Sequence, residues 1–228
     1  MIEIKKHREP QALTEYRKDP TATYQNMHGA PTGRVDSEGK KIDVYRVVLK
    51  SLMEEQGYLC AYCMRRIPER HGKIRASIEH IDPQSKTDRL KALDYSNMLA
   101  VCSGNRDAGT KDAKTCDAHR GNDKLSINLT RKSTLSQIDY RSNGRIFSDD
   151  EPINAQLNET LNLNCKARDL IALRKSALNR MQVMIKKKNR EGDRAFYGKI
   201  LNLYLQDISP KEEYVGILIN WLEKHLTS

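Results

Sequence analysis

Four of the five cysteines have the spacing of a zinc site. Cys60 and Cys63 form a C-x2-C pair, and Cys102 and Cys116 follow after a long gap as a C-x13-C pair. Four thiolates complete the tetrahedral coordination of Zn²⁺. The competing interpretation, a thioredoxin-like redox pair, requires a βαβ context, whereas here a helix precedes the first pair and a loop and strand follow it. We therefore predict a structural four-cysteine zinc site, and we expect Cys165 to be a small buried apolar residue.

Residues suited to phosphodiester hydrolysis lie between these cysteines and directly after the last of them. Glu79 and His80 are adjacent at the expected end of a strand, and Asn97, Asp117 and His119 follow. Hydrolysis needs a base for water, a hard cation for the developing charge, and ligands that hold this cation. A strand directs adjacent side chains to opposite faces, but we expect the twist at its end to bring Glu79 and His80 toward one pocket. Each residue also has a structural alternative, since a lone histidine is usually packed in a core and an asparagine often bonds to its own backbone.

The order of these residues resembles the zinc-containing HNH (ββα-metal) endonucleases. The pattern consists of Cys60-x2-Cys63, Glu79-His80-Ile81, Asn97, Cys102 and Cys116. In finer detail it is similar to the HNH nucleases of retron and Septu anti-phage systems. That similarity depends on I-K-K and E-P-x-A-L-T-E-Y-R near the start, I-E-H-I-D-P-Q-S, N-M-L-A-V-C-S-G and C-D-x-x-R-G-N, all within residues 1–122.

The resemblance implies a role for each candidate residue. His80 would be the general base that activates water, and Glu79 would hold a catalytic Mg²⁺ or Mn²⁺. Asn97 would be either a second ligand or the group that orients His80. Asp117 would be the third ligand, because a carboxylate suits Mg²⁺, and His119 is the rival for this place. The sequence departs from the family in having Asp117 directly after the last cysteine and in its long C-x13-C gap.

The resemblance also implies the activity and its setting. It predicts a metal-dependent endonuclease, an antiviral defence effector that leaves 5′-phosphate and 3′-hydroxyl ends and is gated by an ATPase partner. DNA is the expected substrate, and tRNA is the alternative within the same enzyme class. From a different functional class, the chain could be a non-catalytic subunit that is stabilised by structural zinc and binds nucleic acid.

The elements that must position these residues are predicted from apolar periodicity. We predict a helix with one apolar face at residues 42–56, a strand at residues 74–81 and a short apolar segment at residues 97–102. We predict an α+β fold with an extended N-terminal arm at 1–40, an HNH nuclease core with the zinc site at 41–125, and a hairpin plus helices at 126–228. Ser142-Asn143-Gly144 signals the hairpin turn, and the capping box that starts at Ser209 predicts a final helix through Trp221.

Positive charge is concentrated in one part of the chain. The formal net charge is +10, which favours a polyanionic partner. Between Lys166 and Arg190 there are nine basic residues and one acidic residue, and apolar residues at three- and four-residue steps predict a helix there. The candidate nucleic-acid-binding residues, here called the basic cluster, are Lys186, Lys187, Lys188 and Arg190. Docking on an acidic partner and an ordinary solvated surface are the alternatives.

Other sequence features bear on localisation. No apolar run approaches the roughly 18 residues of a membrane span. The basic residues near the start have no apolar segment behind them, so we expect no secretory signal and no membrane partner. These features predict a cytoplasmic protein.

Overall fold

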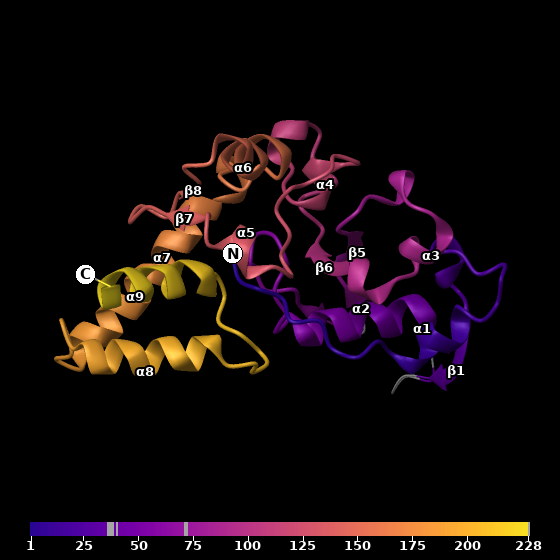
Figure 1. Ribbon diagram of the computed structural model, residues 1–228, viewed down its shortest axis with the longest axis horizontal. Coiled ribbons are helices and arrows are strands. Elements are labelled where there is room, and N and C mark those ends of the chain that lie inside the picture. The colour runs from indigo at the N-terminus through magenta and orange to yellow at the C-terminus, as the bar shows by residue number, and fades with distance from the viewer. Residues whose placement is uncertain (36–38, 40, 71–72, 228) are drawn as a thin grey trace.

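The computed structural model describes residues 1–35, 39, 41–70 and 73–227. The fold is α+β, as predicted, with short antiparallel strand pairs among helices (Figure 1). The helices are α1 (Gln11–Tyr16), α2 (Val44–Glu55), α3 (Arg89–Ala92), α4 (Asp117–Arg120), α5 (Lys132–Leu135), α6 (Glu151–Ala155), α7 (Leu170–Lys187), α8 (Arg194–Leu205) and α9 (Val215–Thr227). The strands pair two by two in chain order and are β1 (Pro31–Val35), β2 (Lys41–Asp43), β3 (Glu69–Arg70), β4 (Lys73–Ile74), β5 (Ala76–His80), β6 (Met98–Cys102), β7 (Asp139–Tyr140) and β8 (Ile146–Phe147).

The antiparallel β5–β6 pair lies against α2. Its register places Glu79 opposite Leu99 and His80 opposite Met98. Every residue of β6 is buried, which explains why this segment is a continuous apolar run instead of an alternating one. The buried amide of Gln56, directly after α2, accepts from the Ala100 backbone N–H and donates to the Ala100 carbonyl, both at 2.8 Å. The end of α2 is therefore bonded to the middle of β6.

The N-terminal segment is part of the core. The expected extended arm is wrong for residues Gln11–Tyr16, which form α1. Five apolar side chains of the segment are buried in the common core, namely Met1, Ile4, Leu13, Ala22 and Met27. Burial of this much apolar surface offsets the entropy of ordering a segment that is rich in proline and glycine.

The predicted hairpin and basic helix are both present, as β7–β8 and α7, and they pack on each other. Gly144 in the hairpin turn has a φ of +93°, and a Cβ there would lie 2.2 Å from the Ile171 carbonyl oxygen of α7. Arg174 of α7 is buried and donates to the Gly144 and Leu163 carbonyls at 2.7 and 2.9 Å. This arginine contributes to the basic character of the sequence but not to the basic surface.

The final helix begins later than the capping box predicts. It starts at Val215, so the prediction of a helix opening at Pro210 is wrong. The segment before it bonds instead to residues on either side of the Cys60–Cys63 pair. Lys211 N–H donates to Gly57 O at 3.1 Å, and Tyr214 N–H donates to Met64 O at 3.1 Å. These long-range backbone bonds outcompete the local signal.

Helices α7, α8 and α9 gather at one end of the molecule, opposite the end that holds α1 and β1 (Figure 1). Among the described residues, no helix combines the length and apolar character that a membrane span requires.

Candidate metal centre and acidic site

The four cysteines predicted to bind zinc meet at one buried point. Their sulfur atoms all lie within 4.8 Å of one another. The Sγ–Sγ distances are 3.8 Å for Cys60–Cys116, 3.8 Å for Cys63–Cys102 and 3.9 Å for Cys102–Cys116. A tetrahedron with Zn–S bonds of about 2.3 Å has edges of about 3.8 Å. The thiols therefore have the size and arrangement of a four-cysteine zinc site, and it is the one such cluster of at least three ligands among the described residues.

The long gap in C-x13-C is closed at its base. Thr115 N–H donates to Gly104 O at 2.8 Å, so the loop between them leaves and returns at nearly the same place. Gly104 has a φ of +56°, and a Cβ on it would lie only 2.1 Å from the Thr115 carbonyl oxygen. Glycine is required for this close approach. The contact brings Cys116 next to Cys102, as a C-x2-C spacing would.

The fifth cysteine lies outside this centre. Cys165 is buried, as predicted, and its thiol donates to the Asp112 carbonyl at 3.3 Å. Within the centre, hydrogen bonds with the other three thiols lower the pKa of Cys102. A bound cation would extend deprotonation to all four thiols.

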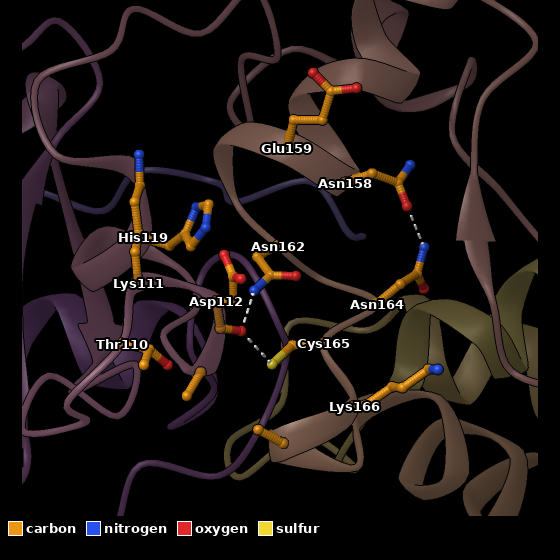
Figure 2. Close-up of a pocket in the computed structure, with 12 residues that line it drawn as sticks. Thr110, Lys111, Asp112, His119, Asn158, Glu159, Asn162, Asn164, Cys165 and Lys166 are labelled. Atoms are coloured by element: carbon orange, nitrogen blue, oxygen red, sulfur yellow. Dashed lines mark hydrogen bonds between the residues drawn. The ribbon is translucent and has the colours of Figure 1, made fainter.

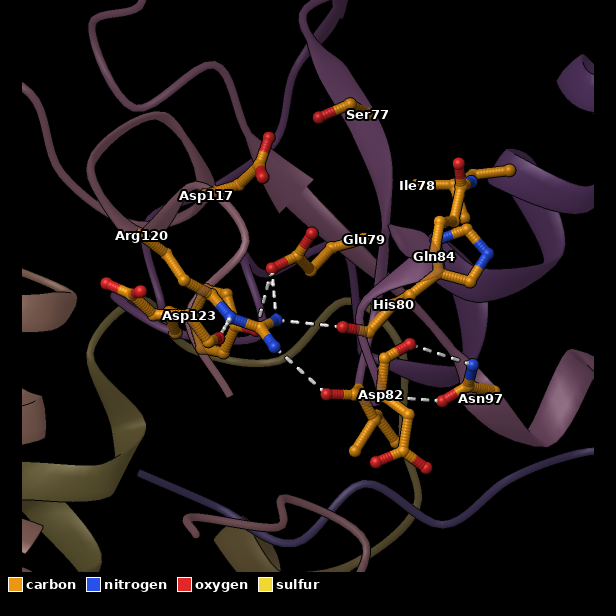
Figure 3. Close-up of polar contacts among 12 residues, drawn as sticks. Ser77, Ile78, Glu79, His80, Asp82, Gln84, Asn97, Asp117, Arg120 and Asp123 are labelled. Atoms are coloured by element: carbon orange, nitrogen blue, oxygen red, sulfur yellow. Dashed lines mark hydrogen bonds and ion pairs between the residues drawn. The ribbon is translucent and has the colours of Figure 1, made fainter. Parts of the chain in front are cut away.

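Glu79 is held by donors that both bond to one of its carboxylate oxygens. The Tyr62 hydroxyl donates to Oε1 at 3.1 Å, and Arg120 Nη1 forms a buried ion pair with the same atom (Figure 3). Burial, and after it the nearby Asp117 carboxylate, raise the pKa of Glu79 to about 7, while Arg120 opposes both effects. The two acids therefore face each other closely enough to repel.

Asp117 supplies the second carboxylate of this acidic pair. It is the first residue of α4, and its carboxylate lies on the same side of β5 as that of Glu79 (Figure 3). Arg106 from the long loop donates to its Oδ2 at 2.6 Å. Mg²⁺ is commonly bound by one or two carboxylates together with waters and substrate phosphates. Glu79 and Asp117 fit such a cation, which would also relieve their mutual repulsion.

His80 has the surroundings of a neutral base. Its Nε2 lies 2.9 Å from the Ala92 carbonyl, which can only accept, so this nitrogen carries the proton and Nδ1 is left as the acceptor. Nδ1 lies 3.3 Å from the Gln84 side-chain nitrogen, and the Tyr24 ring packs edge-on at 4.7 Å. Burial lowers the pKa of His80. Only 4 % of the residue is exposed.

Glu79 and His80 point in different directions. Figure 3 shows the Glu79 carboxylate directed toward Arg120 and the His80 ring on the other side of β5, near Gln84. This is the ordinary alternation of a strand. The expectation that twist turns both side chains into one pocket is therefore not met in this conformation.

Asn97 organises the loop that follows β5. Its Oδ1 accepts from Asp82 N–H at 2.8 Å, and its Nδ2 donates to the Asp82 and Lys91 carbonyls, both at 3.2 Å. The residue is 1 % exposed, and its amide is saturated by backbone groups. The same loop carries Ala92, the acceptor for His80. This arrangement favours the orienting role for Asn97 over that of a cation ligand.

His119 faces a different region from Asp117. Its Nδ1 lies 2.9 Å from the Thr160 carbonyl, and its ring lines a cavity of about 670 Å³ together with Lys111 and Cys165 (Figure 2). Glu79 is not among the residues that line this cavity. The structure therefore brings Asp117, and not its rival His119, next to Glu79. These two carboxylates are called the acidic site below.

Sequence reasoning missed two residues of this site, Tyr62 and Arg120. Tyr62 is a spacer of the C-x2-C pair, and Arg120 has the appearance of a surface cation at the end of a short helix. Both are 2 % exposed. The arginine of C-D-x-x-R-G-N is the one signal that could have drawn attention to this position.

The basic cluster is exposed, as expected, and lies at the junction of α7 and α8, at the end of the molecule away from β5 and β6 (Figure 1). Arg190 within it pairs with Asp193 at 3.0 Å.

In comparisons with known proteins, no family model matches this chain and no curated protein matches it. The resemblance to HNH nucleases accordingly rests on the motif residues themselves.

Proposed function

We propose that this protein is a metal-dependent HNH endonuclease that hydrolyses phosphodiester bonds of nucleic acid. The observation that carries the proposal is a pair of neighbouring carboxylates, buried Glu79 and half-buried Asp117, next to a four-cysteine centre. His80 follows Glu79 in β5, and burial lowers its pKa. Each acid already has one arginine partner, Arg120 for Glu79 and Arg106 for Asp117. The Asp117 carboxylate nevertheless raises the pKa of Glu79, and a hard cation bound by both acids would relieve this repulsion.

In this proposal the side chains divide the work of hydrolysis. Glu79 and Asp117 hold Mg²⁺ or Mn²⁺, which supplies charge stabilisation for the phosphate when bound. His80 accepts the proton of the attacking water at Nδ1, since its Nε2–H is held by the Ala92 carbonyl. Gln84 now occupies Nδ1, so its side chain moves aside when water binds. Asn97 keeps the loop, and with it the Ala92 carbonyl, in place.

DNA is the proposed substrate. A formal net charge of +10 favours a polyanion, and the exposed basic cluster offers phosphate contacts at a distance from the acidic site. The antiviral role and the gating ATPase belong to the same proposal through the resemblance of the motifs.

The test is cleavage of plasmid DNA and of tRNA by purified protein, with and without Mg²⁺ or Mn²⁺. We expect divalent-dependent nicking of DNA, lowered about 100-fold or more in His80→Ala, which is the usual scale for a general base. His119→Ala removes a comparably buried histidine outside the site and should keep most of the activity. Zinc content and melting temperature of both variants report on folding.

Each outcome of this test is informative. Cleavage of tRNA but not DNA would retain the enzyme and change its substrate. Wild-type protein that binds DNA but cleaves neither polymer with either cation would support the non-catalytic binding subunit. Equal losses in His80→Ala and His119→Ala would contradict the assigned base.

A further inference from the structure

Both donors that bond to Glu79 come from the cysteine segments. Tyr62 stands between Cys60 and Cys63, and its hydroxyl lies 3.1 Å from Glu79 Oε1. Arg120 ends the one-turn helix that begins directly after Cys116, and its Nη1 bonds to the same oxygen. The four-cysteine centre is therefore connected to Glu79 of the acidic site by two side chains.

The Arg120 guanidinium is fixed in turn by the backbone around it. Nη1 lies 2.8 Å from the Tyr62 hydroxyl and 2.8 Å from the His80 carbonyl. Nη2 donates to the Ile81 carbonyl at 3.0 Å, and Nε donates to the Asp123 carbonyl at 2.7 Å. A guanidinium that spans the end of β5 and the end of α4 sets their relative position. A lysine has neither the fork nor the number of donors to do this.

The bonds to Oε1 leave the other oxygen of Glu79 on the side of Asp117 (Figure 3). Nη2 and Nε of Arg120 already bond to backbone carbonyls, so the arginine pairs with one oxygen of Glu79. Donors to a carboxylate also favour its ionised form. Groups that hold a metal ligand in this way commonly change metal affinity by 10- to 100-fold when they are removed.

We propose that Tyr62 and Arg120 are positioning residues that hold Glu79 with its second oxygen directed toward Asp117, where the two acids can bind a divalent cation, and so couple the cation site to the cysteine centre. The inference rests on the proposed function only in taking Glu79 and Asp117 as the cation ligands. Neither residue contacts substrate in this scheme, because each acts through Glu79.

The direct test is Mn²⁺ binding to the full-length, zinc-loaded protein, measured by calorimetry and by electron paramagnetic resonance without nucleic acid. Tyr62→Phe removes one hydroxyl and should weaken Mn²⁺ binding about 10-fold while zinc stays stoichiometric. Tyr95→Phe is the matched control. Tyr95 is also buried and donates to a carboxylate, Glu55, at 2.9 Å, but that carboxylate lies outside the acidic site. The control should lose similar thermal stability and keep wild-type Mn²⁺ affinity.

Arg120→Lys provides a second variant that retains the charge. We expect it to weaken Mn²⁺ binding by at least as much as Tyr62→Phe, because the fork that fixes Glu79 is removed. Wild-type Mn²⁺ affinity in both variants would overturn the inference, as would an equal loss in Tyr95→Phe. If the wild type binds Mn²⁺ and Tyr62→Phe weakens it, but neither cleaves DNA or tRNA, the positioning role stands and the nuclease proposal falls. If the wild type binds no Mn²⁺, the inference is overturned as well.

Discussion

Replacing Gly104 by alanine should open the cysteine centre. The new Cβ would lie 2.1 Å from the Thr115 carbonyl oxygen and 3.0 Å from the Ala118 Cβ, at a φ of +56°. The left-handed conformation costs alanine about 1 kcal/mol, and overpacking against backbone costs a further 1–3 kcal/mol or so. A total of about 3 kcal/mol corresponds to a melting temperature lower by about 6–12 °C for a chain of this size. Because the displaced residue is next to Cys116, zinc binding should weaken too.

The assay is thermal unfolding followed by circular dichroism, together with zinc release to a chromogenic chelator. Gly109→Ala is the matched control, since Gly109 lies in the same loop and a Cβ there meets nothing within 4 Å. We expect the control to unfold within about 0.5 kcal/mol of wild type and to keep its zinc. Gly104→Ala should release zinc at a lower chelator concentration. If the two variants unfold and release zinc alike, the contact between Gly104 and Thr115 does not hold Cys116 in place.

Three further results are expected. Cys116→Ser should give zinc-depleted, poorly soluble protein, because a four-cysteine site contributes folding energy directly. Cys165→Ser should keep its full zinc content by elemental analysis. The reverse result would make Cys165 the fourth ligand in place of Cys116. Changing the four residues of the basic cluster to glutamine should weaken DNA binding about equally for all DNA sequences. It should also flatten the slope of log K against log[salt] by about 0.9 for each phosphate that is no longer neutralised. An unchanged slope would make the cluster a solvated surface or a protein-docking site. Asp117→Asn should abolish Mn²⁺ binding while His119→Ala leaves it intact, and loss in His119→Ala alone would exchange their roles.

Local patterns predicted the parts of the fold that local physics determines. The helix expected at 42–56 is α2, Val44–Glu55, and the strand expected at 74–81 is β5, Ala76–His80. The turn residues at Gly144 predicted the β7–β8 hairpin. In each case the periodicity of apolar residues, or a residue suited to positive φ, is sufficient information. The spacing of four cysteines likewise predicted their convergence, because one cation imposes one geometry on all of them.

The features that the sequence did not reveal depend on contacts between distant residues. The final helix lacks its predicted first turn because Lys211 and Tyr214 bond to Gly57 and Met64, which lie far earlier in the chain. Arg174 has the appearance of a surface cation but is buried under the β7–β8 hairpin. No local rule distinguishes a buried arginine from an exposed one, since burial depends on which carbonyls the rest of the fold supplies.

Glu79 and His80 are held in place by different parts of the chain. Glu79 is fixed from the cysteine segments, by Tyr62 and Arg120. His80 is fixed by Ala92 and Gln84 of the loop after β5, and by Tyr24 of the N-terminal segment. Loss of zinc should therefore disturb the acidic pair first, whereas displacement of the N-terminal segment should expose His80 first. Because adjacent residues of one strand face opposite sides, a site that needs both must be assembled from both directions at once. In the proposed site, the N-terminal segment supplies the His80 side through the Tyr24 ring.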